Sequence, residues 1–220
     1  MNLLIRLMET SKFHYLLVSL ALMIVAYPFI EGGGFAEHLF LIIILAIFFS
    51  SLYMFHHSPR LRLFAYINGG LMLLLGVLSG FMPMIPQVLQ IIYALSTLNF
   101  FIFLAMAIIA DFLHTKEVTA DTISGAACVY LLIGITWSLA YALLEYIAPG
   151  SFHFSMPIKT IRLTNTSSFS YFSFVTLTTV GFGDITPVSK GAVIMEAILG
   201  QLYIAIFLAR IIGSYQRVKK

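Results

Sequence analysis

The feature that most limits how this chain can fold is a series of long apolar segments separated by short breaks. A helix that crosses a hydrocarbon core of about 30 Å needs about 20 apolar residues. Six segments approach or exceed that length, and Gly, Pro and Ser mark several of the breaks between them. They run over residues 13–30, 39–55, 61–81, 87–112, 123–147 and 190–214. We therefore predict an all-α membrane protein with six transmembrane helices.

Composition supports a membrane protein and argues against other classes. Of the 220 residues, 60% are hydrophobic and only 10% are charged, whereas an average soluble domain carries roughly 25% charged residues. The net charge of +3 is too small, and too confined to ends and loops, to indicate nucleic acid as a partner. The single cysteine, Cys128, lies in an apolar run, so one chain can form no disulfide and no thiolate metal site. We expect membrane lipids as neighbours and no cofactor.

The positions of the basic residues predict an orientation. If all six segments span, one side of the membrane receives most of these residues: Arg6, Lys12, Arg60, Arg62, Lys116, Arg217, Lys219 and Lys220. The positive-inside rule makes that side cytoplasmic, although Lys159 and Arg162 fall on the other side. Both termini are then cytoplasmic, in a plasma (inner) membrane. Residues 1–12 read as an amphipathic segment on the membrane surface, 13–114 as a four-helix region, and 115–220 as a separate domain.

The stretch between the fifth and sixth predicted helices does not read as an ordinary loop. Residues 148–164 are polar and turn-rich. Residues 165–178 are long enough for a helix of about 20 Å, which is too short to span, with Ser167 and Ser168 as candidate caps. A glycine-spaced, extended stretch follows. Since non-helical backbone at membrane depth must be buried in protein or line a wet cavity, we predict a re-entrant pore helix and an extended loop.

Residues 176–184 read TLTTVGFGD and carry the most specific signal in the sequence. This stretch resembles the signature of tetrameric potassium channels, which have one pore loop between two helices. A potassium ion that loses its water needs replacement oxygens, and stacked backbone carbonyls supply them. The candidate ligands are the carbonyls of Thr179, Val180, Gly181 and Phe182, with the Thr179 hydroxyl. Gly181 and Gly183 permit the left-handed backbone that aims successive carbonyls at one axis.

The resemblance implies a potassium-selective channel whose only ligands are permeant potassium ions. Because one chain supplies one loop and a ring of oxygens must surround the ion, we expect a homotetramer with cyclic symmetry. Two alternatives remain open: a weakly selective cation channel, and a subunit of a cation transporter. We expect no enzyme, because no metal-ligand spacing, nucleophile set or phosphate-binding loop is present in the sequence.

In this family the stretch that binds the ions, here residues 179–183, is called the selectivity filter. The resemblance also marks residues that support the filter, namely Tyr171, Phe172, Val175, Thr176, Thr178 and Asp184. Tyr171 and Phe172 fall where the family places an aromatic cuff, and Tyr171 is spaced to donate a hydrogen bond to Asp184. Phe182 replaces the more usual tyrosine, which removes a bond worth roughly 0.5–1.5 kcal/mol per subunit. Val175 stands where some members carry a glutamate. We therefore expect a filter that is less tightly braced.

Three residues of the last helix are candidates for a role at the inner pore. Gly200 is a candidate hinge, although close packing between helices is the simpler interpretation. Glu196 is an acid inside an apolar helix, and we favour a structural hydrogen bond behind the filter over a role in conduction. Arg210 lies near the inner mouth, where a snorkelling anchor is favoured over a gate element.

The first four predicted helices do not carry a voltage sensor. Such a sensor needs Arg or Lys recurring along the fourth helix, and residues 87–110 contain neither. Asn68, Gly69 and Gly70 mark a candidate tight crossing point in the third helix. His56, His57 and His114 lie near the predicted inner surface, where we favour an interfacial position over pH sensing.

Overall fold

The computed structural model describes residues 12–30, 35–55, 58–81, 86–114, 119–155 and 166–218. Of the residues singled out above, Arg6, His56, His57, Lys116, Lys159, Arg162, Lys219 and Lys220 lie outside these ranges. The predicted interfacial segment also lies outside them, except for its last residue. The described helices are α2 (Lys12–Ile30), α3 (Phe35–Met54), α4 (Pro59–Phe81), α5 (Gln87–His114), α6 (Ala120–Ile147), α7 (Ser167–Leu177) and α8 (Gly191–Val218). Two short strands, β1 (Phe152–Phe154) and β2 (Ile185–Pro187), complete the set.

Four of the described helices are long and apolar enough to cross a membrane. These stretches are Pro59–Leu78, Gln87–Leu113, Ala120–Ile147 and Gly191–Ile212. The apolar stretches of α2 and α3, Phe13–Ala26 and Leu41–Met54, are shorter. The protein is therefore a mostly helical integral membrane protein, and the count of six crossings stays a prediction.

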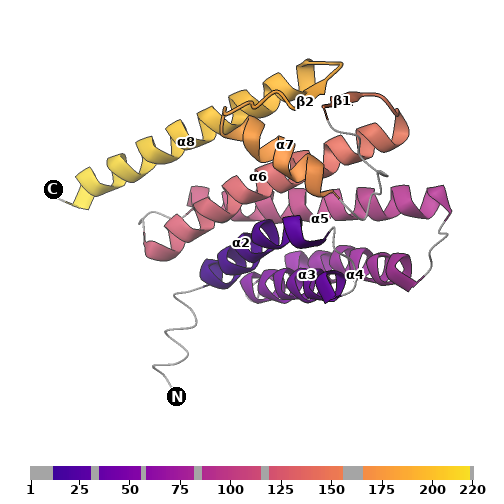
Figure 1. Ribbon diagram of the computed structural model, residues 1–220. Helices are drawn as coiled ribbons and strands as arrows, with labels where there is room; N and C mark the ends of the chain where they lie inside the picture. The colour runs from indigo at the N-terminus through magenta and orange to yellow at the C-terminus, as the bar shows by residue number, and fades with distance from the viewer. Residues whose placement is uncertain are drawn as a thin grey trace.

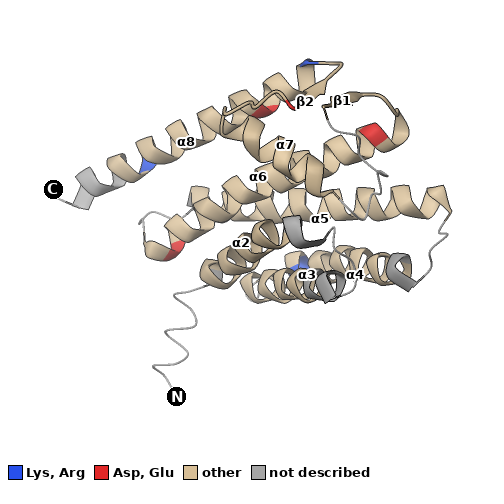
Figure 2. Ribbon diagram, in the orientation of Figure 1, with Lys and Arg blue, Asp and Glu red and all other residues tan. Residues whose placement is uncertain are grey.

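The helices are arranged around α5 and α6, which lie in the middle of the molecule (Figure 1). On one side are α2, α3 and α4, and on the other are α7, α8 and the β1–β2 ribbon. Charged residues are sparse along the described helices (Figure 2), as expected for segments that face a bilayer. The two halves of the sequence thus form two adjoining regions: α2–α5, and α6–α8 with the ribbon.

The larger apolar core joins α2–α5 to one face of α6. Its fully buried side chains include Leu16, Ile47, Phe100 and Leu132. Gly69 allows a close crossing within it, because a Cβ there would lie 2.5 Å from the Phe48 ring. The tight crossing predicted at residues 68–70 is thus present at Gly69, whereas a Cβ on the neighbouring Gly70 would meet nothing within 4 Å.

The start of α2 is held against the start of α6 by polar and steric contacts. Asp121 accepts a hydrogen bond of 2.9 Å from the backbone amide of Phe13, and its carboxylate lies 3.5 Å from His14 Nδ1. The Phe13 ring fills the space where Gly125 has no side chain, since a Cβ there would lie 2.9 Å from the ring. This contact joins the first half of the chain to the second.

Two local predictions for the segment after α6 were incomplete or wrong. The short helix is present as α7, but its N-cap is Thr166, whose side chain makes no capping hydrogen bond, so the caps predicted at Ser167 and Ser168 are wrong. The turn-rich stretch contains β1, which pairs antiparallel with β2 and aligns His153 with Thr186. A strand of three residues is too short to produce a recognisable alternation in the sequence.

Candidate functional site

The short helix α7 is seated closely on α6 by small residues and hydroxyl groups. Ser138 of α6 and Ser170 of α7 are hydrogen-bonded at 2.7 Å, with both side chains buried. The absence of a side chain on Gly134 admits the Phe174 ring, because a Cβ there would lie 2.6 Å from it. Small residues and interhelical hydroxyl bonds are the usual means by which helices approach closely in a membrane. The position of α7 relative to α6 is therefore set by directional contacts.

The backbone that follows α7 alternates in handedness. Positive φ angles occur at Thr179 (62°), Gly181 (56°) and Gly183 (78°), whereas Val180 and Phe182 between them are not in this region. The left-handed conformation predicted for the two glycines is thus confirmed. A side chain in this region costs about 1–2 kcal/mol of strain, so Thr179 carries a strain that the sequence did not indicate.

The amides at the start of this stretch point back to the C-terminal end of α7. Thr179 N donates to Thr176 O (2.9 Å), and the amides of Val180 and Gly181 both donate to Val175 O (2.9 and 3.3 Å). The carbonyl oxygens of residues 179–183 accept no backbone amide from the described part of the chain.

Tyr171 contacts the end of the predicted filter stretch, residues 179–184, that lies further along the chain. Its ring stacks on that of Phe182, with centroids 6.3 Å apart and an angle of 2° between the planes. Desolvation raises the pKa of Tyr171 above its ordinary value, and a hydrogen bond to the Asp184 carboxylate raises it further. The hydroxyl thus stays protonated and able to donate at neutral pH. The predicted Tyr171–Asp184 pair is present.

Within one chain, Phe172 packs among aromatic residues of α6, α7 and β1. Its side chain is buried in an aromatic cluster with Tyr141, Phe152 and Phe169. The rings meet edge to face with centroids 5.3–5.5 Å apart, a favourable geometry for aromatic pairs. Within one chain, Phe172 therefore joins α7 to α6 and β1, and the apolar contact to Phe182 comes from Tyr171.

The β1–β2 ribbon ties the chain after the filter to the end of α6. Ser155 N donates to Asp184 O, and Val188 N donates to Ser151 O (both 2.9 Å). The buried Glu145 carboxylate accepts the backbone amides of Gly150 (2.8 Å) and Phe152 (2.9 Å). Sequence reasoning missed Glu145. An acid near the end of an apolar helix, directly before a Pro-Gly turn, was the available signal.

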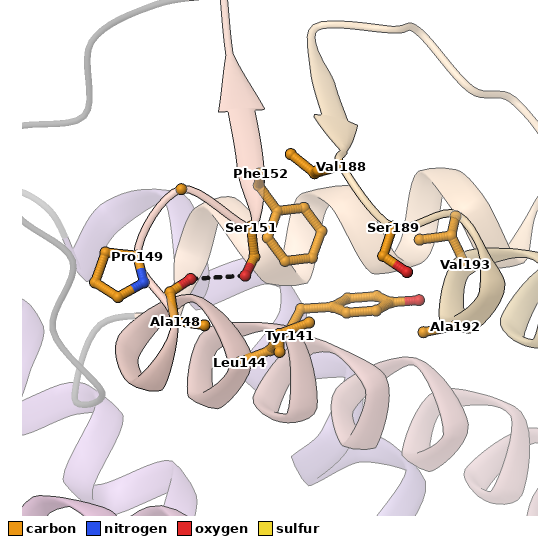
Figure 3. A pocket seen from close by; sticks show the side chains of 11 residues that line it. Tyr141, Leu144, Ala148, Pro149, Ser151, Phe152, Val188, Ser189, Ala192 and Val193 are labelled. Atoms are coloured by element: carbon orange, nitrogen blue, oxygen red, sulfur yellow. Dashed lines mark hydrogen bonds between the residues drawn. The ribbon is translucent and has the colours of Figure 1, made fainter.

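A cavity of about 350 Å³ lies beside this ribbon, between the end of α6 and the start of α8 (Figure 3). Tyr141 and Leu144 of α6, Phe152 of β1, and Ala192 and Val193 of α8 line it. The Tyr141 side chain reaches from α6 toward α8 beneath the Phe152 ring (Figure 3). The cavity is mostly apolar, and its walls come from α6, β1, α8 and the turns beside them.

Helix α8 approaches the end of α7 closely at Gly200. A Cβ on this residue would lie 2.6 Å from the Leu177 carbonyl oxygen. Tyr203, one turn further along, donates a hydrogen bond of 2.7 Å to Ala126 O of α6. The packing interpretation of Gly200 therefore fits these contacts, and a role as a hinge stays a prediction.

Glu196 and Arg210 make contacts that agree with structural roles. Glu196 is completely buried and is hydrogen-bonded to Tyr141 of α6 and Ser173 of α7. Arg210 donates to Phe112 O of α5, and its guanidinium carbon lies 4.1 Å from the centroid of the Phe112 ring. The hydrogen-bonded role predicted for Glu196 is thus present, and Arg210 joins α8 to the end of α5.

The remaining filter-support residues are placed at the C-terminal end of α7. The Thr178 hydroxyl donates to Phe174 O (2.6 Å), and the Thr176 side chain is buried. Val175 is half-buried, and its carbonyl receives the two filter amides described above. Since a glutamate is absent at Val175, Tyr171 is the bracing partner of Asp184 that the described residues provide.

Comparison with protein families gives a match in the same part of the chain as the contacts described above. Residues 140–217 match a family model described as an ion channel. Searches among curated proteins and among solved structures gave no match. The matched range covers the end of α6, the ribbon, α7, the filter stretch and α8. The chain is an integral membrane protein, and this range supports an ion channel.

Proposed function

We propose that the chain is one subunit of a potassium-selective channel that conducts passively through the backbone carbonyls of residues 179–182. The observation that carries the proposal is the alternating backbone at residues 179–183, with its first amides turned back toward α7. This arrangement leaves carbonyl oxygens free to replace the hydration shell of an ion. Residues of the filter stretch are exposed in the single chain, including Val180 (54%) and Phe182 (69%).

A homotetramer follows from the same geometry. One chain offers oxygens from one direction only, whereas an ion in a narrow pore needs oxygens all around it. Four copies about one axis meet that need with closed symmetry. The apolar, largely exposed surface of α8 supports this assembly, because much of it would then be covered by neighbouring copies.

The proposal includes six crossings per subunit, with α7 as a re-entrant pore helix. At 11 residues α7 is too short to span, and it lies between α6 and α8, which are long enough. The basic residues place both termini on the cytoplasmic side of a plasma (inner) membrane. We assign α2–α5 no voltage-sensing role, because α5 contains no Arg or Lys.

The test of selectivity is the reversal potential of the purified protein in planar bilayers with opposed potassium and sodium gradients. We expect the reversal potential to follow the potassium gradient. A reversal potential near zero, with a large sodium current, would replace the proposal by a weakly selective cation channel.

The same bilayers test the absence of a voltage sensor. We expect open probability to change little with voltage, since each charge that crosses the field contributes only about 2.3 kcal/mol per 100 mV and α5 supplies no basic charge. A steep conductance–voltage curve, equivalent to several moved charges, would contradict this part of the proposal.

A further inference from the structure

Glu196 has an environment that is unusual for an acid. Its side chain is 0% exposed, and it lies in the first half of α8, a helix long and apolar enough to cross a membrane. Among the described residues, no Lys, Arg or His forms an ion pair with it. A charged carboxylate in such a place costs several kcal/mol unless a cation compensates it.

The contacts of Glu196 form a chain that joins three helices. The Tyr141 hydroxyl of α6 donates to Glu196 Oε2 at 2.7 Å. Glu196 Oε1 is hydrogen-bonded to the Ser173 hydroxyl of α7. The same Ser173 oxygen lies 2.7 Å from the Gly134 carbonyl oxygen of α6. Ser173 thus stands between two oxygens that both serve as acceptors when the acid is ionised.

Counting protons distinguishes the two states of this acid. A serine hydroxyl has one hydrogen to donate, so Ser173 cannot donate to Gly134 O and to a carboxylate at once. If Glu196 is ionised, one of these two contacts loses its hydrogen bond. If Glu196 is protonated at Oε1, it donates to Ser173, and Ser173 donates to Gly134. The neutral acid completes every contact in the chain and buries no charge.

We propose that Glu196 carries a proton in this state and is a positioning residue that holds α7 in place between α6 and α8. The inference rests on the proposed function in one respect: α7 is the helix that carries the filter. Removing the proton makes Ser173 turn from Gly134 toward the carboxylate. The hydroxyl bond that seats α7 on α6 at this level is then lost.

Glu145 provides an internal contrast. It is also buried, at 5% exposed, but its two carboxylate oxygens accept two backbone amides, which are obligate donors. A backbone amide can only donate, whereas a serine hydroxyl can both donate and accept. These two buried glutamates therefore differ in their partners, which are backbone amides for Glu145 and hydroxyl groups for Glu196.

The titratable groups around Glu196 come from few elements. The described elements that pack against α8 include α6 and α7. Helix α6 presents Tyr141 and, at longer range, Tyr130. Helix α7 presents Ser173, whereas its Tyr171 is bonded to Asp184 instead. Neither tyrosine is a cation, so neither neutralises a negative charge on Glu196.

The direct test is the infrared spectrum of the purified protein at neutral pH, in which a protonated carboxylic acid gives its own carbonyl stretch. We expect this band in the wild type, its loss in Glu196→Gln, and its retention in Glu145→Gln as the matched control. Glutamine at position 196 can donate to Ser173 and accept from Tyr141, so this variant should keep the fold. A Glu196→Gln spectrum unchanged from the wild type in this region would overturn the assignment.

A second variant keeps the test decisive if Glu196→Gln does not fold. Tyr141→Phe removes the donor to Oε2 and should shift the frequency of the same band. An unshifted band would mean that the signal comes from another acid, and would overturn the assignment. These spectra do not depend on which ion is conducted, so they test the protonation of Glu196 independently of the proposed potassium selectivity.

The positioning role is tested by the pH profile of ion flux in proteoliposomes. We expect wild-type flux to fall as the pH rises and Glu196 ionises, whereas Glu196→Gln keeps its flux. At the alkaline end the two should differ by about fivefold, the factor that the loss of one hydrogen bond corresponds to. Identical pH profiles for the two proteins would overturn the positioning role.

Discussion

Among the described residues, hydroxyl bonds between helices are more frequent in α6–α8 than in α2–α5. In α2–α5, hydroxyls such as those of Ser51 and Thr97 bond to carbonyls of their own helix. In α6–α8, the bonds of Ser138, Ser173 and Tyr203 cross between helices. The main exception in the first region is Asn68 of α4, which bonds Asn99 and Ser96 of α5.

This difference shows which helices are held at fixed positions relative to one another. Packing of apolar side chains tolerates substitution as long as volume and pattern are kept. Hydrogen bonds between helices, by contrast, require donor and acceptor to meet at fixed distances and angles. The interhelical hydroxyl bonds named above join α6, α7 and α8, whereas the larger apolar core lies between α2–α5 and α6.

Gly181→Ala should have the largest effect on conduction. The backbone at residue 181 has a φ of 56°, and the strain of a side chain there is about 1–2 kcal/mol in each subunit. We expect potassium current to be lost, or the potassium-to-sodium permeability ratio to drop by at least about tenfold. The measurement is the reversal potential, and chemical cross-linking checks that the oligomer still forms. Unchanged selectivity would remove residue 181 from the conduction site.

Gly200→Ala should have the next largest effect. The added Cβ would meet the Leu177 backbone oxygen at 2.6 Å, which cannot swing aside like a side chain. Overpacking of this kind costs about 1–3 kcal/mol, and we expect potassium flux in proteoliposomes to fall by about tenfold. Gly191→Ala, in the same helix, is the matched control, since a Cβ there meets nothing within 4 Å. Equal flux in both variants would show that the α7–α8 contact is not important for conduction.

Tyr171→Phe should weaken the brace without destroying the filter. The change keeps the ring that stacks on Phe182 and removes the hydrogen bond to Asp184, worth about 0.5–1.5 kcal/mol. We expect a permeability ratio within about tenfold of the wild type and a faster decline of current during sustained conduction.

Because the bond raises the pKa of Tyr171, its contribution is present below the ordinary tyrosine pKa of about 10 and is lost above that range. Single-channel records at neutral and strongly alkaline pH check both points, and a wild-type decline unaffected by alkaline pH contradicts the second.

Phe100→Ala should have the smallest effect on conduction, although it removes a large buried side chain. Phe100 is fully buried in the core of α2–α5, and a cavity of this kind costs about 3–5 kcal/mol. We expect a lower midpoint of thermal unfolding in detergent with an unchanged reversal potential. A changed permeability ratio would mean that the first region also sets the geometry of the filter.

Much of the fold and the chemistry of the site could be predicted from the sequence, because both depend on local properties. Apolar length predicts membrane helices by itself, and the boundaries of α4, α5, α6 and α8 fall within a few residues of the predicted ones. The need for φ > 0 at Gly181 and Gly183 is equally local, since only glycine adopts it freely. The Tyr171–Asp184 pair followed from the resemblance.

Contacts between distant residues were decided by the tertiary structure. No local sequence pattern predicts that Glu145 binds the amides of Gly150 and Phe152, or that β1 pairs with β2 across about 30 residues. The contacts of Phe172 within the chain were decided in the same way, because an aromatic side chain has the same local preference in any apolar surrounding, and the rings of α6 and β1 are its neighbours here.

The two acids Glu145 and Glu196 give the clearest example of this difference between local properties and tertiary contacts. Both acids lie in apolar helices that are predictable from the sequence, where an acid needs hydrogen-bonding partners, but only Glu196 was recognised at that level. Their partners are set by the fold, and they are two amides for Glu145 and two hydroxyls for Glu196. The charge of a buried acid depends on the donors around it, and those donors arrive from other elements of the fold.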